Sequence, residues 1–148
     1  MSPHHVSVFF YGSYINRGVL AEVGLAPVSW AVATLPGFDI RIAPRANLVR
    51  AVDGVAFGVL ASATHEELRR LYSHAEQILG EIYLPQAVLV RAADAWTPAL
   101  CYIAPAMAER PAERAYVERI LQPAQELGFP RWYLQRLEFF LPRAPTSA

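Results

Sequence analysis

VFFYGS, at residues 8–13, is the stretch of the sequence that says most about the fold. Its first three residues are β-branched or aromatic, the types enriched in strands, and Tyr11-Gly12-Ser13 has the composition of a turn. The stretch predicts a first strand over residues 6–10 that ends in a tight loop. Because Gly12 lacks a Cβ and successive N–H groups in a turn can bind an anion, this loop is a candidate ligand site. Many strands end this way without a ligand, so the purely structural interpretation stays open.

Downstream of this loop, the pattern predicts a series of strands. Apolar or β-prone segments at 28–35, 38–43 and 48–52 are separated by turn residues, and 82–90 and 99–103 have the same character. Asp53-Gly54 stands between 48–52 and 55–60 and predicts a hairpin turn, because both residues tolerate positive φ.

Helical signals are concentrated later in the chain. Asn16 is a candidate cap for a short helix over 17–23, and Thr64 with Glu67 forms a capping box for a helix that ends near residue 76. Two further helices are expected, over 111–127 and after Pro130. Strands come mostly first and helices later, without regular βαβ alternation. We therefore expect one α+β domain over residues 1–148, with an ordered core at about 6–141 and a small mixed or antiparallel, β-barrel-like sheet flanked by helices.

Composition narrows the class of protein. Hydrophobic residues make up 54% of the 148 and charged residues 18%, which is typical of a compact globule and not of a disordered chain. The formal net charge is zero and cations are not clustered, so nucleic acid and anionic membranes are not expected partners. A single cysteine, Cys101, excludes an intrachain disulfide, and there is no signal-like start or membrane-length apolar run, so we expect a cytoplasmic protein.

Glu76 is the most interesting ionisable residue because its neighbours over 71–79 are mostly apolar or aromatic. Burial there would favour the protonated carboxyl group, which suits proton transfer near neutral pH. The alternative is an exposed glutamate at a helix end, and Glu66, Glu67 and Glu81 have the pattern of solvated charges. No metal is expected, because His74 and Glu76 have no second histidine at ligand spacing and no cysteine pair, and the His4-His5 pair lies at the terminus of the chain. Cys101 lies in an apolar strand and is expected to be inert core.

Four stretches, taken in order, resemble the gamma-glutamylcyclotransferase-like (AIG2-like) superfamily. The strand and Tyr-Gly-Ser loop at 8–13 resemble the family's opening. The segments 46–49 and 54–60 resemble its Ala-Asn-Ile motif and following strand. Residues 66–71 lead to Glu76 and, seven residues later, to Tyr83. Tyr116, Gly128-Phe129-Pro130 and 133–137 resemble its closing pattern.

This resemblance implies an activity and a set of site residues. The activity is intramolecular aminolysis of a γ-glutamyl amine or related small amide, which releases 5-oxoproline and needs no cofactor. Glu76 would be the general acid and base, and a small-molecule substrate would bind at a site that consists of Tyr11, Gly12, Ser13, Tyr14, Ile15, Tyr83 and Tyr116.

Two positions depart from the family's pattern. Tyr14-Ile15 replaces the usual Asn-Leu, so a bulky phenol would reshape the pocket, and the acidic motif is altered between Leu71 and Gln77. Glu81 is the second candidate for the acid. Two other functions stay open: a non-catalytic binding or interaction module on the same fold, and an enzyme that cleaves or transfers another amide.

Overall fold

The computed structural model of the chain describes residues 4–143, so the ends of the expected domain lie outside the described residues. The elements follow in the order β1 (His5–Phe10), the 3₁₀ turn η1 (Gly12–Ile15), α1 (Arg17–Ala21), β2 (Trp30–Ile42), β3 (Ala46–Thr64), α2 (His65–His74), the π-helical turn η2 (Ala75–Leu79), β4 (Leu84–Ala92), β5 (Ala95–Ile103), α3 (Arg114–Glu126) and α4 (Arg131–Glu138).

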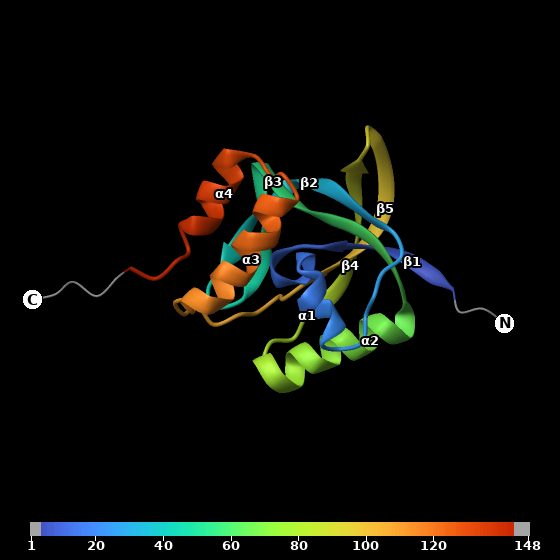
Figure 1. Ribbon diagram of the computed structural model, residues 1–148, viewed down its shortest axis with the longest axis horizontal. Coiled ribbons are helices and arrows are strands. Elements are labelled where there is room, and N and C mark those ends of the chain that lie inside the picture. Colours follow the sequence, from blue (N-terminus) through green and yellow to red (C-terminus); the bar gives the residue numbers. More distant parts are fainter. Residues whose placement is uncertain (1–3, 144–148) are drawn as a thin grey trace, which may run out of the picture.

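The five strands form one mixed sheet in the order β1-β3-β2-β4-β5, which closes where β1 meets β5. That last pair is parallel and is made at Val8 and Leu100, whereas the other neighbours run antiparallel. In Figure 1, α2 lies below the sheet and the α3–α4 pair lies to its left. The predicted α+β class, with a small mixed sheet and flanking helices, is confirmed.

The predicted hairpin at Asp53-Gly54 is wrong. β3 runs without interruption through these residues, and the β2–β3 turn lies at 43–45 instead. Pro36 pairs with Val55, and the next pair along the two strands is Phe38 with Arg50. The chain therefore advances by five residues in β3 but by only two in β2, and the extra residues of β3 form a bulge. A Cβ on Gly54 would come within 2.6 Å of the Phe38 carbonyl oxygen, so the bulge itself needs a glycine. The two strands expected at 28–35 and 38–43 are likewise one strand, β2.

The helix caps agree with the sequence patterns. The Asn16 side chain accepts hydrogen bonds from the N–H groups of Gly18 and Val19 at the start of α1. Thr64 and Glu67 form both bonds of the capping box at α2. α3 starts at Arg114, three residues later than expected, and Gly128 follows its end with φ +78°.

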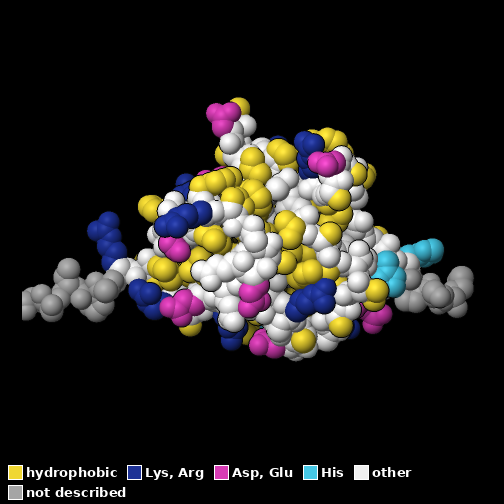
Figure 2. Space-filling model, turned by 45° about the horizontal axis from the view of Figure 1, so that its top comes forward, with side chains coloured by type: hydrophobic (Ala, Val, Ile, Leu, Met, Phe, Trp, Pro, Cys, Tyr) yellow, Lys and Arg dark blue, Asp and Glu magenta, His cyan; other side chains and the backbone are white. Residues whose placement is uncertain are grey.

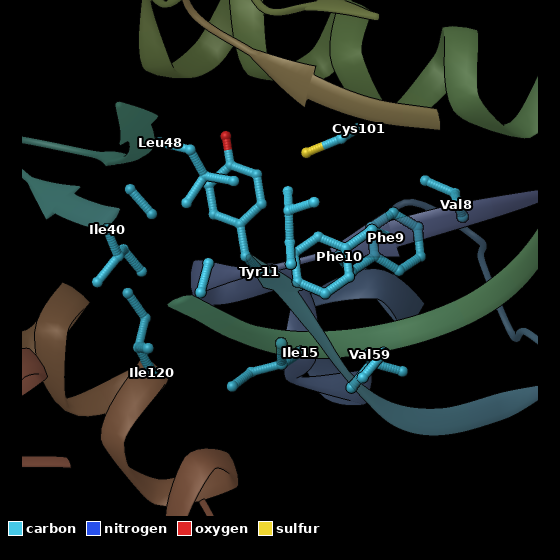
Figure 3. Close-up of a cluster of buried hydrophobic side chains, with 14 of the residues drawn as sticks. Val8, Phe9, Phe10, Tyr11, Ile15, Ile40, Leu48, Val59, Cys101 and Ile120 are labelled. Atoms are coloured by element: carbon cyan, nitrogen blue, oxygen red, sulfur yellow. The ribbon is translucent and has the colours of Figure 1, made fainter. Parts of the chain in front are cut away.

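The core fills the interior of the closed sheet and extends beneath the helices. β1 contributes Val8, Phe9 and Phe10, which are fully buried, and Figure 3 shows them among side chains of β2, β3, β5 and α3. Cys101 of β5 belongs to this core, and burial raises the pKa of its thiol to about 12, so the thiol stays protonated.

The face shown in Figure 2 carries no strong charge field, because arginines and carboxylates are interspersed on it with apolar side chains. Within residues 4–143, none of the helices has the length and apolar character needed to cross a membrane.

Candidate functional site

The Tyr11-Gly12-Ser13 turn packs directly on the start of β3. Gly12 has φ +62°, in the left-handed region, and a Cβ there would collide with the Cβ of Ala46. The turn therefore needs both a glycine at position 12 and a small residue at position 46. Two motifs that are 34 positions apart in the sequence are thus in contact in the fold.

Two tyrosine hydroxyl groups hold the backbone of Ala46. Its N–H donates to the Tyr116 hydroxyl oxygen at 2.9 Å, and its carbonyl oxygen accepts from the Tyr83 hydroxyl at 2.7 Å. Because the Tyr116 oxygen is already an acceptor, its own hydrogen remains free to be donated to a neighbour or a ligand. The Tyr11 hydroxyl donates to the Tyr102 carbonyl oxygen at 2.6 Å and so ties the loop to β5.

Together these groups line a small cavity, which we call the tyrosine cavity. Six of its lining residues are tyrosines, and its walls are formed by Tyr11, Ser13, Tyr14, Ala46, Tyr72, Leu79, Tyr83, Tyr102 and Tyr116. Its volume is about 20 Å³, which is room for about one water molecule. A substrate as large as a glutamyl group requires the side chains to move apart.

Stacked rings form one wall of the tyrosine cavity. Tyr72 lies on Tyr102 with ring centroids 3.8 Å apart and an angle of 11° between the planes. Tyr14 meets the edge of Tyr72 at 5.6 Å and is itself in edge contact with Phe10. The phenol expected to reshape the pocket is therefore part of its wall.

The cavity tyrosines stay protonated near neutral pH. Burial raises the pKa of Tyr11, Tyr14, Tyr72 and Tyr83, in each case as the main cause. Burial also raises the pKa of Tyr116, against the opposing effects of the Ala46 N–H, the Ser13 hydroxyl and a nearby cation. The cavity therefore offers neutral hydroxyl groups that donate and accept hydrogen bonds.

Two charged groups act on these hydroxyls. The guanidinium of Arg45 lies 4.8 Å from the ring centroid of Tyr116 and lowers the pKa of Tyr14, Tyr83 and Tyr116. The carboxylate of Glu81 raises the pKa of Tyr83 and Tyr116. One cation and one anion thus act on the hydroxyl groups of the cavity, although neither side chain lines it.

Of the two interpretations of Glu76, the exposed glutamate at a helix end is the one that the structure bears out. Glu76 is in η2 and is exposed, because Ala75 and Leu79, which are four positions apart, face inward and leave it on the outer side of the turn. The expected solvation of Glu81, in contrast, is wrong, since this residue is only 7% exposed. Gly80, with φ +76°, ends η2 and redirects the chain towards the interior. Neither carboxylate is among the residues that line the tyrosine cavity.

The other predicted site residues are distributed as follows. Tyr11, Ser13, Tyr14, Tyr83 and Tyr116 all line the cavity, with Tyr83 just before β4 rather than inside it. Gly12 contributes the turn, and Ile15, the last residue of η1, is buried in the core and does not line the cavity. In Figure 3 the Tyr11 ring projects from the end of β1 beside Leu48.

Three neighbours of the cavity were not predicted. Tyr72 and Tyr102 complete its wall, and Arg45 supplies its positive charge. Tyr72 stands at a helical spacing of four from Leu68, which indicated only a buried position. Arg45 and Tyr102 had no local sequence signal, because their place near the site depends on the β2–β3 turn and on the closure of the sheet between β1 and β5. Among residues 4–143, no group of three or more His, Cys, Asp or Glu residues is placed to hold a metal ion.

Comparison with known proteins identifies the fold. No family model and no curated protein sequence matches the chain. An uncharacterised protein from Homo sapiens superposes with a TM-score of 0.81 at 18% identity over 97% of this chain and 92% of that one. A gamma-glutamyl cyclotransferase gives 0.80 at 18% identity over 98% and 93%. An AIG2-like protein from Mus musculus gives 0.53 at 15% identity over 71% and 80%. The chain has the gamma-glutamylcyclotransferase-like fold.

Proposed function

We propose that the chain is a gamma-glutamylcyclotransferase-like enzyme that converts a small γ-glutamyl amide into 5-oxoproline and a free amine. The observation that carries this proposal is the tyrosine cavity at the Tyr11-Gly12-Ser13 turn, on a fold shared with a gamma-glutamyl cyclotransferase. A buried carboxylate, Glu81, acts on two of the tyrosines that line this cavity. Hydroxyl groups and backbone N–H groups are suited to a small polar substrate.

The reaction needs one proton transfer in each direction. The α-amine nitrogen attacks the γ-carbonyl carbon, a new C–N bond closes the five-membered ring, and the original amide C–N bond breaks. The proton lost by the attacking nitrogen is delivered to the leaving nitrogen, so the atoms balance without a cofactor. A single carboxylate can accept the first proton and deliver the second. Because both reacting groups belong to one molecule, the enzyme mainly has to hold the cyclising conformer.

Glu81 is the carboxylate that best fits this role. It is buried, and its negative charge raises the pKa of the Tyr83 and Tyr116 hydroxyl groups. Glu76 was the residue implied by the family spacing, but its exposure leaves it outside the enclosed region. In this proposal, the backbone N–H groups around Gly12 and the Tyr116 hydroxyl hydrogen, which the bond to Ala46 does not use, hold the oxyanion that develops on the γ-carbonyl.

The experiment is a 5-oxoproline assay over a panel of γ-glutamyl amides, with Glu81→Gln and Glu76→Gln compared as a matched pair. We expect product from at least one substrate. We also expect kcat to fall by about a hundredfold or more in Glu81→Gln, the usual contribution of an acid–base residue, and to stay near wild type in Glu76→Gln. A large loss in Glu76→Gln with little loss in Glu81→Gln would assign the acid–base role to Glu76. If no substrate gave 5-oxoproline, the proposed reaction would be wrong.

The volume of the tyrosine cavity favours a second candidate function, a non-catalytic binding module. At about 20 Å³ the cavity is filled by its own side chains, Tyr14 among them. A metabolite that co-purifies with the protein, or stabilises it on heating, and is recovered unchanged after incubation would support this alternative. Release of an amine without 5-oxoproline would instead indicate an enzyme that cleaves or transfers another amide.

A further inference from the structure

The tyrosine cavity is too small for the proposed substrate, so one of its walls has to move before a ligand can enter. Six of the chain's seven tyrosines line the cavity, and the space that they leave is about 20 Å³. Because protein interiors are close-packed, a ligand enters only where a wall side chain can leave its place. The contacts that hold each tyrosine show which side chain that is.

Three of the six tyrosines are held through their hydroxyl groups. The Tyr11 hydroxyl donates to the Tyr102 carbonyl oxygen at 2.6 Å. The Tyr83 hydroxyl donates to the Ala46 carbonyl oxygen at 2.7 Å, and the Tyr116 hydroxyl oxygen accepts from the Ala46 N–H at 2.9 Å. Moving any of these three rings breaks a partly buried hydrogen bond and leaves a backbone group without its partner, which is costly. These rings are fixed walls.

Tyr72 and Tyr102 hold each other. Their rings are stacked with centroids 3.8 Å apart and 11° between the planes. Tyr72 is buried and also contacts the ring of Tyr83, and the backbone of Tyr102 pairs with Pro85 of β4. Displacing either ring would separate the stacked pair, so these two rings are fixed walls as well.

Tyr14 is held less firmly than the other five. It is half-buried in the short turn η1, and its aromatic contacts are edge contacts, with Phe10 at 6.1 Å and Tyr72 at 5.6 Å between ring centroids. Its hydroxyl has no hydrogen bond within residues 4–143. That hydroxyl is also open to water, because the buried unpaired side-chain atoms of the described chain comprise the Tyr133 hydroxyl alone. Tyr14 can therefore leave the wall without breaking a hydrogen bond.

We propose that Tyr14 is the gate of the tyrosine cavity: its ring rotates outward, and the buried half of the ligand takes the place that the ring leaves. This inference rests on the proposed function, in which that half is a glutamyl group. The vacated space is that of one phenol ring, so Tyr14 sets the size of the group that the cavity accepts. The closed arrangement predominates because the open one loses two edge contacts. A ligand that binds only the open form has its affinity reduced by the fraction of open molecules.

The first test separates KM from kcat in Tyr14→Ala, which removes the gate. With γ-glutamylalanine as substrate and 5-oxoproline as the readout, we expect KM to fall about tenfold, as for a gate that is open in about 10% of the wild-type molecules. The value of kcat should change by less than about twofold, because the gate acts before the reaction. Tyr14→Phe keeps the ring and therefore keeps the high KM. A KM that rises or stays unchanged in Tyr14→Ala would overturn the inference, since the ring would then not exclude the ligand.

Phe139→Ala is the matched control. Phe139 is 74% exposed at the end of α4 and lies outside the cavity, so this variant also loses an aromatic ring but not the gate. It should keep the wild-type KM and kcat. Thermal melting of each variant checks that the fold is retained.

A second measurement needs no substrate turnover. In wild-type protein that contains 3-fluorotyrosine, ¹⁹F relaxation dispersion records exchange at each tyrosine, and Tyr14→Phe identifies the Tyr14 signal. We expect microsecond-to-millisecond exchange with a minor state of about 10% at Tyr14, and none at Tyr133, which is fully buried in the core. A Tyr14 signal without exchange would overturn the inference. If no form of the protein gave 5-oxoproline, the proposed function would be wrong, and the presence or absence of exchange at Tyr14 would alone decide whether Tyr14 is a gate.

Discussion

Ala46 connects the separate parts of the candidate site at the level of single residues. Its side chain is small enough for Gly12 to approach, and its N–H and carbonyl groups are bound by Tyr116 and Tyr83. Ala46 is 5% exposed, so water cannot replace a lost partner. The tyrosine hydroxyls are therefore structural as well as chemical groups.

Tyr116→Phe is expected to lower the free energy of unfolding by about 1–3 kcal/mol, because it leaves the buried Ala46 N–H without an acceptor. Urea denaturation measures the effect. Tyr102→Phe is the control: its ring stacks on Tyr72, and its hydroxyl has no hydrogen bond within residues 4–143. We expect a change within about 0.5 kcal/mol for this control. Equal losses in the two variants would mean that the bond to Ala46 contributes nothing.

At the level of elements, α2 and η2 bring side chains to the cavity, and the start of α2 is fixed by its capping box. The Thr64 N–H donates to a Glu67 carboxylate oxygen at 2.9 Å, and the Glu67 N–H donates to the Thr64 hydroxyl oxygen at 3.0 Å. Tyr72 and Leu79 follow on the same continuous helical segment and line the cavity. The stability of this segment therefore bears on the shape of the site.

Thr64→Ala is expected to destabilise the protein by about 0.5–2 kcal/mol, because it removes the side-chain acceptor at the helix start. The matched control is Ser73→Ala, an exposed position on the same helix where alanine favours helix formation. Chemical denaturation of both variants, followed by circular dichroism, measures the difference. If Thr64→Ala unfolds at the same urea concentration as Ser73→Ala, the capping box does not stabilise the fold.

Sequence patterns predicted these elements well where their causes are local. The caps at Asn16 and Thr64 depend on residues within one helical turn, and both were predicted correctly. The prediction of a turn at Asp53-Gly54 was wrong. The glycine is needed there because the Phe38 carbonyl oxygen, on the paired strand β2, lies too close to leave room for a Cβ. A local pattern does not contain that contact.

Glu76 and Glu81 show the same limit of local sequence patterns in the candidate site. Family spacing favoured Glu76, but the orientation of a side chain after a helix end depends on the geometry of that end. Here the helix continues as a π-helical turn and then reverses direction at Gly80, which exposes Glu76 and buries Glu81. Neither the turn nor its effect on direction follows from the apolar composition of residues 71–79.

At the level of the whole molecule, the site is assembled from segments far apart in the sequence. The tyrosine cavity takes side chains from the residue after β1, η1, the start of β3, α2, η2, the segment before β4, β5 and α3. The ordered family motifs predicted several of these tyrosines. They did not predict Arg45, Tyr72 or Tyr102, because closure of the sheet decides which side chains meet.

This concentration of buried phenols makes the whole fold sensitive to alkali. Burial raises the pKa of Tyr11, Tyr14, Tyr72 and Tyr83 above the usual value of 10, so these groups bind protons more tightly in the folded state than in the unfolded state. Below pH 10 both states keep the protons and stability does not depend on these groups. Above pH 10 the unfolded chain loses them first, and each tyrosine lowers the free energy of unfolding by up to about 1.4 kcal/mol per pH unit.

Four such groups together lower stability by up to about 6 kcal/mol per pH unit, which is comparable to the whole stability of a typical domain. We therefore expect the protein to unfold cooperatively between about pH 10 and 12, with tyrosinate absorbance and loss of circular dichroism appearing in one transition. A pH titration that records both signals tests this. Tyrosinate absorbance that develops fully while the circular dichroism stays native would show that the phenols ionise inside the folded protein. That result would contradict the conclusion that burial keeps the cavity tyrosines protonated.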